Sequence, residues 1–350
     1  MSRRLKATHG SPRSENELAS LRIRRSWSAA TGAALTAAGL DPAGVADVLA
    51  RAIAEDLPAA AGLGVDATSA ATVPAELVAT GRIVSRADGV VAGLPVAAAV
   101  FEAVVGHNAE ITLMATDGDV VKPGTEVLQV RGPVRGLLTA ERTALNLLCH
   151  LSGVATATRA WVDAIAGTGA AVRDTRKTLP GLRALEKYAV RAGGGVNHRM
   201  SLVDAALVKD NHVVAAGGVV AAFAAVRAAF PGLPVEVECD TVEQVREAID
   251  AGADLILLDN MTLDDLRASV ALARAASLKP NSGAASPEPD SGASAKPDSG
   301  RAGVLLEASG GLTLAVAAEV AATGVDYLAV GGLTHSVTAL DLGLDLTLDE

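Results

Sequence analysis

The sequence predicts an α/β protein whose C-terminal half is built on a parallel sheet of about six strands. After residue 170, short runs rich in β-branched residues alternate with Ala-rich helical segments. One amphipathic helix, such as 241–251 or 262–275, separates most successive runs, and charged residues or glycines follow each run. Repeated βα units of this size indicate a parallel sheet, either open or closed into a barrel.

The six predicted strands are the hydrophobic runs at 171–174, 206–209, 235–238, 255–258, 304–307 and 327–330. We expect their interiors to be apolar and the charged side chains to be confined to their ends. Because a βα barrel places its active site at the carboxyl ends of its strands, the residues that follow these runs are the candidate site.

The N-terminal half has a different pattern. Residues 81–135 contain short β-like runs broken by glycine, including 89–96, and turn signals at that spacing predict a small all-β or α+β domain. We expect a helix at 47–57 and one or two helices over 139–165. The longest apolar stretch, 90–101, is interrupted by Gly93 and Pro95 and is too short to span a bilayer.

Two segments are predicted to lack fixed structure. Residues 1–35 are basic and Ser-rich, and we expect a disordered tail, since Glu15 and Glu17 argue against a transit peptide. Residues 279–300 repeat the text P-D-S-G and indicate a flexible insertion on the barrel face opposite the active site, so its deletion should leave activity intact. The remaining chain divides into an N-terminal domain, 36–150, and a barrel domain, 151–350.

Composition restricts the function. The 350-residue chain has a net charge of −10, and half of it is hydrophobic with only 2% aromatic residues. The two isolated cysteines, Cys149 and Cys239, fit a reducing compartment and a cytoplasmic location. The basic run at 173–199 stands out in this acidic chain; it excludes a general nucleic-acid surface and indicates a pocket for a small, multiply charged anion.

The six strand ends differ in chemistry. The first two are cationic and suit carboxylates or phosphates. The middle two supply Glu238 and Asp259, which suit sugar hydroxyls, Mg²⁺ or a developing positive charge. The last two are small residues before helices, whose backbone N–H groups can hold a phosphate. A ligand with anionic groups at both ends and a sugar between them would use all six.

Each feature has an ordinary structural alternative. Paired glycines are common in tight turns, and Arg176 and Lys177 could belong to a solvated loop. Glu238 and Asp259 could cap helices, and His198 taken alone could have a structural role. Arg142 follows Glu141 on a helix, where surface pairing is usual. The convergence of all these residues on one face favours the functional interpretation.

Several motifs occur together and in order: E-R-T-A-L-N-L-L, D-T-R-K-T-L-P-G-L-R, G-G-G-V-N-H-R, L-V-K-D-N-H, V-E-V-E, L-L-D-N-M, E-A-S-G-G and V-G-G-L-T-H-S. At these residues the chain resembles the quinolinate phosphoribosyltransferase family. The resemblance implies an N-terminal α/β sandwich and a C-terminal open barrel of about six parallel strands. It also implies conversion of quinolinate and phosphoribosyl pyrophosphate to nicotinate mononucleotide, pyrophosphate and CO₂, with Mg²⁺ as cofactor.

The resemblance further assigns roles to residues. Those expected to bind the quinolinate carboxylates are Arg176, His198, Arg199 and Lys209, together with Arg142 from the neighbouring subunit of a homodimer. The expected catalytic residues are Lys177, between the two substrates, and Glu238 and Asp259, at the ribose hydroxyls and Mg²⁺. The residues expected at the 5′-phosphate are Ser309, Gly310, Gly331 and Gly332, and Thr175 and Gly311 complete the substrate-binding motifs. Dimer and hexamer of three dimers both stay open, and neither nucleic acid nor membrane is expected as a partner.

Two other interpretations stay open. A related phosphoribosyltransferase, such as the molybdenum-associated paralogues of the same fold, would use the phosphate-binding strand ends with a different acceptor. Residues 117–124, D-G-D-V-V-K-P-G, resemble the turn-rich text of lipoyl or biotinyl carrier domains, although Lys122 precedes Pro123 instead of standing at an exposed hairpin tip.

Overall fold

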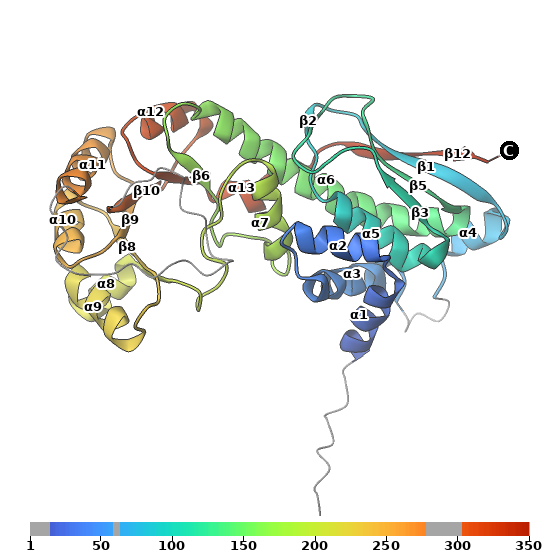
Figure 1. Cartoon of the computed structure of the whole chain (residues 1–350), viewed down its shortest axis with the longest axis horizontal. Coiled ribbons are helices and arrows are strands. Elements are labelled where there is room, and N and C mark those ends of the chain that lie inside the picture. Colours follow the sequence, from blue (N-terminus) through green and yellow to red (C-terminus); the bar gives the residue numbers. More distant parts are fainter. Residues whose placement is uncertain (1–14, 59–63, 278–302, 350) are drawn as a thin grey trace, which may run out of the picture.

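A six-stranded parallel sheet forms the wall of the C-terminal half in the computed structural model, which describes residues 15–58, 64–277 and 303–349 (Figure 1). The strands are β6 (Ala171–Arg173), β7 (Ala206–Val208), β8 (Val235–Cys239), β9 (Leu255–Asp259), β10 (Leu305–Ser309) and β11 (Tyr327–Ala329). Their order is β6-β11-β10-β9-β8-β7, and every pair is parallel. The sheet is open between β6 and β7, which confirms the predicted α/β fold with about six strands.

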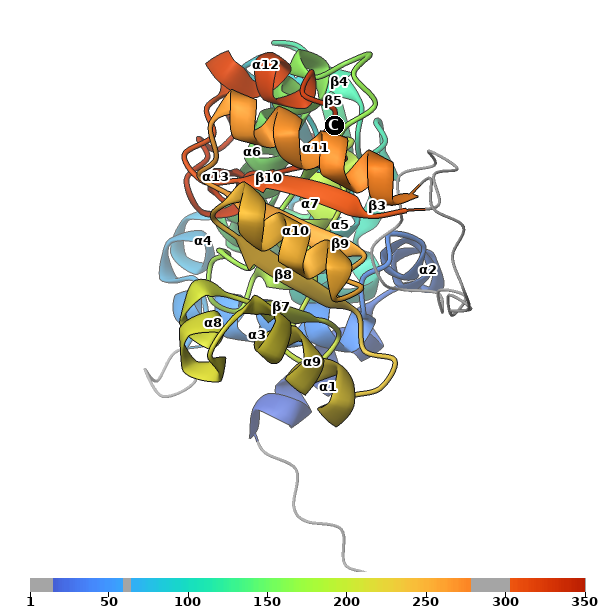
Figure 2. The ribbon, with the colours of Figure 1, turned by 90° about the vertical axis from the view of Figure 1, so that its left-hand side faces the viewer.

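The outer helices follow the strands in order (Figure 2). They are α8 (Asp210–Ala216), α9 (Val219–Ala229), α10 (Val242–Asp250), α11 (Leu263–Ser277) and α12 (Ala317–Ala321). Helix α10 begins where Thr241 and Gln244 cap each other: the Thr241 hydroxyl accepts from Gln244 N, and the Gln244 side chain accepts from Thr241 N. This reciprocal cap fixes the first turn within a few residues of the end of β8.

The gap beside β6 is filled by a loop. After α7 (Arg183–Ala192), the backbone returns along the free edge of β6, where Val196 N donates to Val172 O at 2.8 Å and Asp174 N donates to Val196 O at 3.2 Å. The residues that follow Val196, among them His198 and Arg199, are therefore fixed beside the end of β6.

The second sheet is antiparallel and belongs mainly to the N-terminal half. It consists of β1 (Val78–Ser85), β3 (Glu110–Leu113), β5 (Glu126–Pro133) and β12 (Leu342–Leu348), in the order β12-β1-β5-β3. Burial alternates along β1, as expected of a sheet with one face covered. The covering helices are α5 (Leu94–Val105) and α6 (Val134–Ala164). The short strands β2 (Gly89–Val90) and β4 (Val120–Val121) pair beside this layer, and α4 (Ala67–Thr72) packs on α6.

The β-like interpretation of 89–96 is wrong beyond β2. The chain enters α5 at Leu94, after Gly93 turns with a positive φ of 103°. The N-terminus of this helix is capped from a distance, since the Asp117 carboxylate accepts from Gly93 N at 2.9 Å and from Leu94 N at 3.1 Å. A cap supplied 23 residues or more downstream leaves no local signal in the sequence.

The assignment of all of 151–350 to the barrel is also wrong at its C-terminal end. Residues 342–348 form β12, which pairs with β1 from Ala79↔Leu348 to Ser85↔Leu342. Helix α6 continues across the predicted boundary at 150 as one helix of 31 residues and contacts elements of both halves. The two halves are therefore joined twice.

The predicted disorder of 1–35 is wrong from residue 15 onward. Helices α1 (Glu15–Ser26), α2 (Ala29–Ala37) and α3 (Pro42–Asp56) pack together near α5. Trp27 Nε1 donates to Ala99 O at 3.0 Å and Ser28 N donates to the buried Glu102 at 2.7 Å, so α5 anchors this segment. Residues 1–14 and the insertion 279–300 lie outside the described residues.

Within the described part of the chain, no single helix has the length and apolar character needed to cross a bilayer. Two bent helix pairs, α2 with α3 and α8 with α9, pass the same test of length and composition together.

Candidate active site

The first and last strands of the barrel bring Lys177 and Gly331 together. Lys177 is exposed beyond the end of β6, and a Cβ atom added at Gly331 would lie 2.9 Å from its Cδ atom. The Thr334 hydroxyl donates to Lys177 O at 2.6 Å, and Lys177 N donates to the Thr175 hydroxyl at 3.0 Å. A predicted catalytic lysine therefore lies against a predicted phosphate-binding glycine, although 154 residues separate them in the sequence.

Arg176 and Arg199 are neighbouring cations in the candidate site. Burial and the neighbouring Arg176 charge lower the pKa of Arg199, while the carboxylates of Glu236 and Asp204 act in the opposite direction. The Nε atoms of Arg176 and Arg199 are both buried without a hydrogen-bond partner. Among the described residues, neither side chain forms an ion pair. Arg199 Nη1 donates to Ala205 O at 2.7 Å, so the backbone satisfies one of its donors but neutralises none of its charge. Two adjacent cations without an ion-pair partner form a site that suits a carboxylate.

The carboxylates of the middle strands lie at the same end of the barrel. Glu238 is mostly buried, and its Oε2 atom lies 3.4 Å from Lys209 Nζ. Asp259 is level with Ser309 on the adjacent strand β10. Lys209 and Glu238 thus join the cationic and acidic strand ends in one site.

Asn260 connects the acidic strand end to the glycines of the next strand. It adopts a left-handed conformation with φ of 52°, donates through its N–H to Ser309 O at 3.0 Å, and donates through Nδ2 to Asp259 at 2.6 Å. A Cβ atom at Gly310 would lie 2.3 Å from Asn260 Oδ1, so only glycine fits there. Gly311 follows, and Gly332 opens α13 (Gly332–His335) at the end of β11.

His198 is placed differently from the expectation that it contacts a substrate carboxylate. Its side chain is buried, with Nε2 lying 2.8 Å from Glu236 Oε2, and its Nδ1 accepts from Arg199 N at 2.7 Å. Both ring nitrogens are therefore occupied by the protein itself. The predicted role of His198 stays a prediction, but its nitrogens are directed at Glu236 and the Arg199 backbone.

A layer of charged side chains lies directly beneath the strand ends. Arg173, Glu236 and Glu307 are buried inside the barrel, where Arg173 Nη1 lies 2.6 Å from Glu307 and 3.8 Å from Glu236. The guanidinium of Arg173 also stacks over the Tyr327 ring, with its Cζ atom 4.8 Å from the ring centre. The expectation of apolar strand interiors is wrong at Arg173 and Glu236, and Glu307, expected at the end of the run 304–307, lies in the middle of β10.

Burial dominates the protonation of this layer. It raises the pKa of both Glu236 and Glu307 to about 7, and it lowers the pKa of His198 to about 4. Ligand atoms of His198, Glu236 and Glu307 lie within 4.8 Å of one another, a spacing that could suit a metal ion, but Arg173 already supplies positive charge there. Sequence reasoning missed Glu236 and gave no role to Glu307, which it placed at a strand end. The two-residue spacing between Glu236 and Glu238, which puts both on one side of β8, was an available signal for Glu236.

A buried ion pair supports the loop that carries His198 and Arg199. Lys187 Nζ lies 2.5 Å from Asp174 Oδ1 and donates to His198 O at 2.7 Å, and both charged side chains have no exposed surface. Asp174 also accepts from His198 N at 2.8 Å and from Asn197 Nδ2 at 2.5 Å. The loop is thereby fixed at several points before any ligand binds.

Arg142 is not joined to the other predicted site residues. It is exposed on α6, and among the described residues it forms no hydrogen bond or ion pair; its charge acts on Cys149 of the same helix. Within one chain, no hydrogen bond or ion pair among the described residues links this predicted substrate contact to the site.

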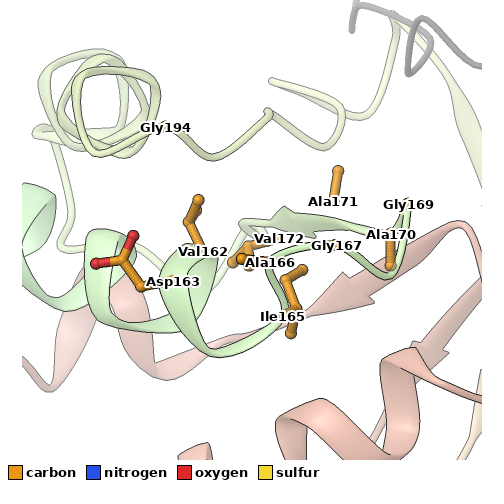
Figure 3. Close-up of a pocket in the computed structure, with 10 residues that line it drawn as sticks. All are labelled: Val162, Asp163, Ile165, Ala166, Gly167, Gly169, Ala170, Ala171, Val172 and Gly194. Carbon is orange, nitrogen blue, oxygen red and sulfur yellow. The ribbon is translucent and has the colours of Figure 1, made fainter.

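A separate hollow lies at the opposite end of β6, where the strand begins (Figure 3). Its lining is made of small and apolar residues from the end of α6, the turn at Gly167 and Gly169, and the start of β6, with Asp163 as the one acidic side chain among them. This composition offers little to a multiply charged anion, and the hollow is distinct from the site at the strand ends.

An open α/β barrel that gathers cations, carboxylates and glycine turns at its strand ends is an anion- and sugar-binding enzyme scaffold. The models of the quinolinate phosphoribosyl transferase N-terminal domain and C-terminal domain match residues 66–152 and 154–345. The chain belongs to the quinolinate phosphoribosyltransferase family. The match of residues 66–152 to that N-terminal domain also shows that the carrier-domain interpretation of 117–124 is wrong.

Similar proteins agree with this assignment. The chain is 52% identical over 301 residues to the nicotinate-nucleotide pyrophosphorylase [carboxylating] of Mycobacterium leprae, covering 86% of this chain and 96% of that protein. It is 36% identical over 311 residues to the rat protein of the same name, covering 88% and 92% of the two chains. The crystal structure of NadC from Streptococcus pyogenes superimposes with a TM-score of 0.76 at 36% identity, covering 89% of this chain and 99% of that one.

Proposed function

We propose that this protein transfers the phosphoribosyl group of phosphoribosyl pyrophosphate to the ring nitrogen of quinolinate, with loss of CO₂, to give nicotinate mononucleotide and pyrophosphate. The observation that carries the proposal is the pair of neighbouring cations Arg176 and Arg199, neither of which has an ion-pair partner among the described residues, together with Lys209 at the next strand end. Quinolinate has two adjacent carboxylates, and a monocarboxylate or a neutral base would leave much of this charge unused. Family membership supplies the reaction class.

The acidic strand ends suit the sugar. As pyrophosphate leaves, the ribose acquires oxocarbenium character, and the carboxylates of Glu238 and Asp259 stabilise that positive charge. Lys177 lies between the cationic end of β6 and the glycine of β11, so it can neutralise the leaving pyrophosphate. The 5′-phosphate would rest on backbone N–H groups at Ser309 to Gly311 and at Gly331 and Gly332.

The second step follows from the first. The pyridine nitrogen attacks C1 of the ribose and becomes cationic. The bond between ring carbon C2 and its carboxylate then breaks, CO₂ leaves, and the electron pair stays on C2, stabilised by the adjacent cationic nitrogen. A proton then binds at C2 and completes nicotinate mononucleotide. Contacts with Arg176 and Arg199 hold the ring so that its nitrogen faces the sugar.

The acidic pair also fits a Mg²⁺ ion bound with the substrate. Hard carboxylate oxygens suit this ion. Lys209 contacts Oε2 of Glu238, and Asn260 donates to Oδ2 of Asp259, so the second oxygen of each carboxylate, Oε1 and Oδ1, is not engaged by these two groups. When bound, Mg²⁺ would supply charge neutralisation for the pyrophosphate. Removal of Mg²⁺ with a chelator should abolish turnover, and its readdition should restore it.

We also propose a homodimer with shared active sites, located in the cytoplasm. The support is Arg142, a cation of the E-R-T-A-L-N-L-L motif that is exposed on α6 and forms no hydrogen bond or ion pair with any described residue of its own chain. Arg142→Ala should abolish quinolinate binding. Mixing it with Lys177→Ala should restore some activity, because one site of a mixed dimer would be intact. No recovery in properly mixed dimers would refute shared sites.

The proposed reaction is tested by quinolinate-dependent release of pyrophosphate and CO₂, with nicotinate as the control substrate. We expect turnover with quinolinate and little with nicotinate. Equal or faster turnover of nicotinate would refute the choice of acceptor and favour a related phosphoribosyltransferase of the same fold.

A further inference from the structure

The charged layer beneath the strand ends is organised around Glu236. This residue is only 3% exposed on β8, and its Oε2 atom lies 2.8 Å from His198 Nε2. Its Oε1 atom is buried without a hydrogen-bond partner and lies 3.8 Å from Arg173 Nη1. None of the roles implied by the family motifs involves Glu236, so a buried carboxylate in this position requires an explanation.

The hydrogen bonds of His198 define which ring nitrogen carries the proton. Because Nδ1 accepts the hydrogen bond of Arg199 N, the ring proton of a neutral His198 is on Nε2, where it is donated to Glu236. The backbone of His198 is fixed as well, through Asp174 on one side and Lys187 on the other. The ring therefore connects the carboxylate of Glu236 to the backbone N–H of Arg199.

The same carboxylate acts electrostatically on the cations above it. Around Glu236, the positive groups are Arg173, Arg199 and Lys209, and Glu238 is the neighbouring negative group on its own strand. Glu307 from β10 is the second negative group: it repels Glu236, and its Oε1 atom lies 3.7 Å from His198 Nε2. Tyr327 from β11 packs its ring against Arg173. The negative charge of Glu236 offsets part of the repulsion that Arg199 experiences from Arg176.

We propose that Glu236 is a positioning residue for the quinolinate pocket: its carboxylate orients the His198 ring, which in turn holds the backbone of Arg199 and thereby sets the position of the Arg199 side chain. The proposal rests on the proposed function and adds a residue outside substrate contact. It concerns the dicarboxylate and not the sugar, because the bonds from Glu236 lead to the loop beside β6. The contacts of Asp259, Asn260 and Gly310 do not involve that loop.

The test compares three substitutions at one position. Glu236→Leu removes both the acceptor and the charge, Glu236→Asp withdraws the charge from the ring, and Glu236→Gln keeps an acceptor of the same shape. For Glu236→Leu we expect the KM for quinolinate to rise by about tenfold or more, while the KM for phosphoribosyl pyrophosphate stays within about twofold. Glu236→Gln should recover most of the quinolinate KM, because the amide oxygen still accepts from His198.

A general loss of structure would give a different result. It would lower the amount of active enzyme and leave both KM values unchanged, or raise both together. If Glu236→Leu does not fold, Glu236→Asp must show the selective rise. The proposal would be overturned if the folded variant, Glu236→Leu or Glu236→Asp, kept the wild-type KM for quinolinate. It would also be overturned if the KM values for quinolinate and phosphoribosyl pyrophosphate rose equally. Glu243→Gln, at an exposed glutamate on α10, serves as the matched control and should leave both KM values unchanged.

The two proposals can fail separately in this assay. If the wild-type protein does not turn over quinolinate, the proposed function is refuted. If the wild type is active and the Glu236 variants show no selective rise, only the positioning role is refuted. Equilibrium binding of quinolinate to the purified wild type and to Glu236→Asp gives the same comparison without turnover.

Discussion

The side chain of Lys177, beyond the end of β6, lies against the backbone of Gly331, at the end of β11, where an added Cβ atom would be 2.9 Å from Lys177 Cδ. The two strands are hydrogen-bonded neighbours although they come first and last in the barrel sequence. The pairing of β6 with β11 in the open sheet therefore places a cation beside the turn proposed to hold a phosphate.

Replacement of Lys177 tests this arrangement. Lys177→Met keeps the alkyl chain over Gly331 and removes the charge, so kcat should fall by a factor of about 10² to 10³, as when a group that stabilises transition-state charge is lost. The melting temperature should not change, because the side chain is exposed. Lys122→Met, at an exposed lysine of the N-terminal half, is the control. A variant with wild-type kcat would remove Lys177 from the catalytic set.

The guanidinium pair gives a second prediction. Arg176→Gln should raise the KM for quinolinate by about tenfold or more, since a charge-assisted contact to a carboxylate is lost. Stability should stay the same or increase slightly, because the substitution relieves repulsion with Arg199. Steady-state kinetics and a thermal melt measure both effects, and Arg246→Gln on α10 is the exposed control. A loss of stability without a change in KM would indicate a structural role for Arg176.

The buried carboxylate of Glu307 predicts a pH effect on stability. Burial raises its pKa from 4.5 to about 7, so the folded protein keeps a proton that the unfolded chain releases between these pH values. This group therefore lowers stability as pH rises from 4.5 to 7. The Glu307→Gln variant has no such proton to lose. The difference in unfolding free energy between this variant and the wild type should therefore shift in favour of the variant by up to roughly 3 kcal/mol from pH 5 to pH 8.

Urea unfolding at the two pH values measures this difference. Glu319→Gln, at an exposed position on α12, should show the pH dependence of the wild type. Parallel pH dependence in Glu307→Gln and the wild type would mean that Glu307 is ionised in the folded protein throughout this range.

The pair of Lys187 and Asp174 predicts a large stability effect away from substrate contact. Lys187→Met leaves the Asp174 carboxylate buried without its cation and should cost about 3 to 5 kcal/mol of unfolding free energy. Adding Asp174→Asn should recover part of that loss. Arg267→Met, which breaks an exposed pair with Asp264, should cost less than about 1 kcal/mol. Chemical denaturation compares the three variants, and equal costs for both pairs would contradict the assignment.

The sequence predicts the barrel well because each βα unit carries its own signals. The predicted strands lie within two residues of β6 to β11, and Thr241 with Gln244 marks the start of α10 locally. The prediction fails where the determining contact is distant in the chain. Gly93 and Leu94 are capped by Asp117, and the segment around Trp27 is held by α5, so neither is evident from its neighbours.

In the candidate site, too, local features could be predicted from the sequence and contacts between distant residues could not. The residues at the strand ends could be identified because polar groups and glycines interrupt apolar runs there. The burial of Glu236 and Glu307 was not predicted, because a charge within an apolar run is buried only when a partner such as Arg173 is supplied by another strand. The occupation of both His198 nitrogens likewise depends on Glu236 and on the backbone of Arg199, and no spacing rule predicts it.

The position of β12 has a consequence for how the protein is made. During synthesis β1 emerges early, yet its partner on one side is formed by residues 342–348, which leave the ribosome more than 250 residues later. Until then β1 is the outer strand of its sheet, with unpaired backbone groups of the kind that recruit other chains. The N-terminal layer therefore reaches its final form only after the whole barrel has been translated, and ribosome-bound chains that stop before residue 342 should be the species most dependent on chaperones.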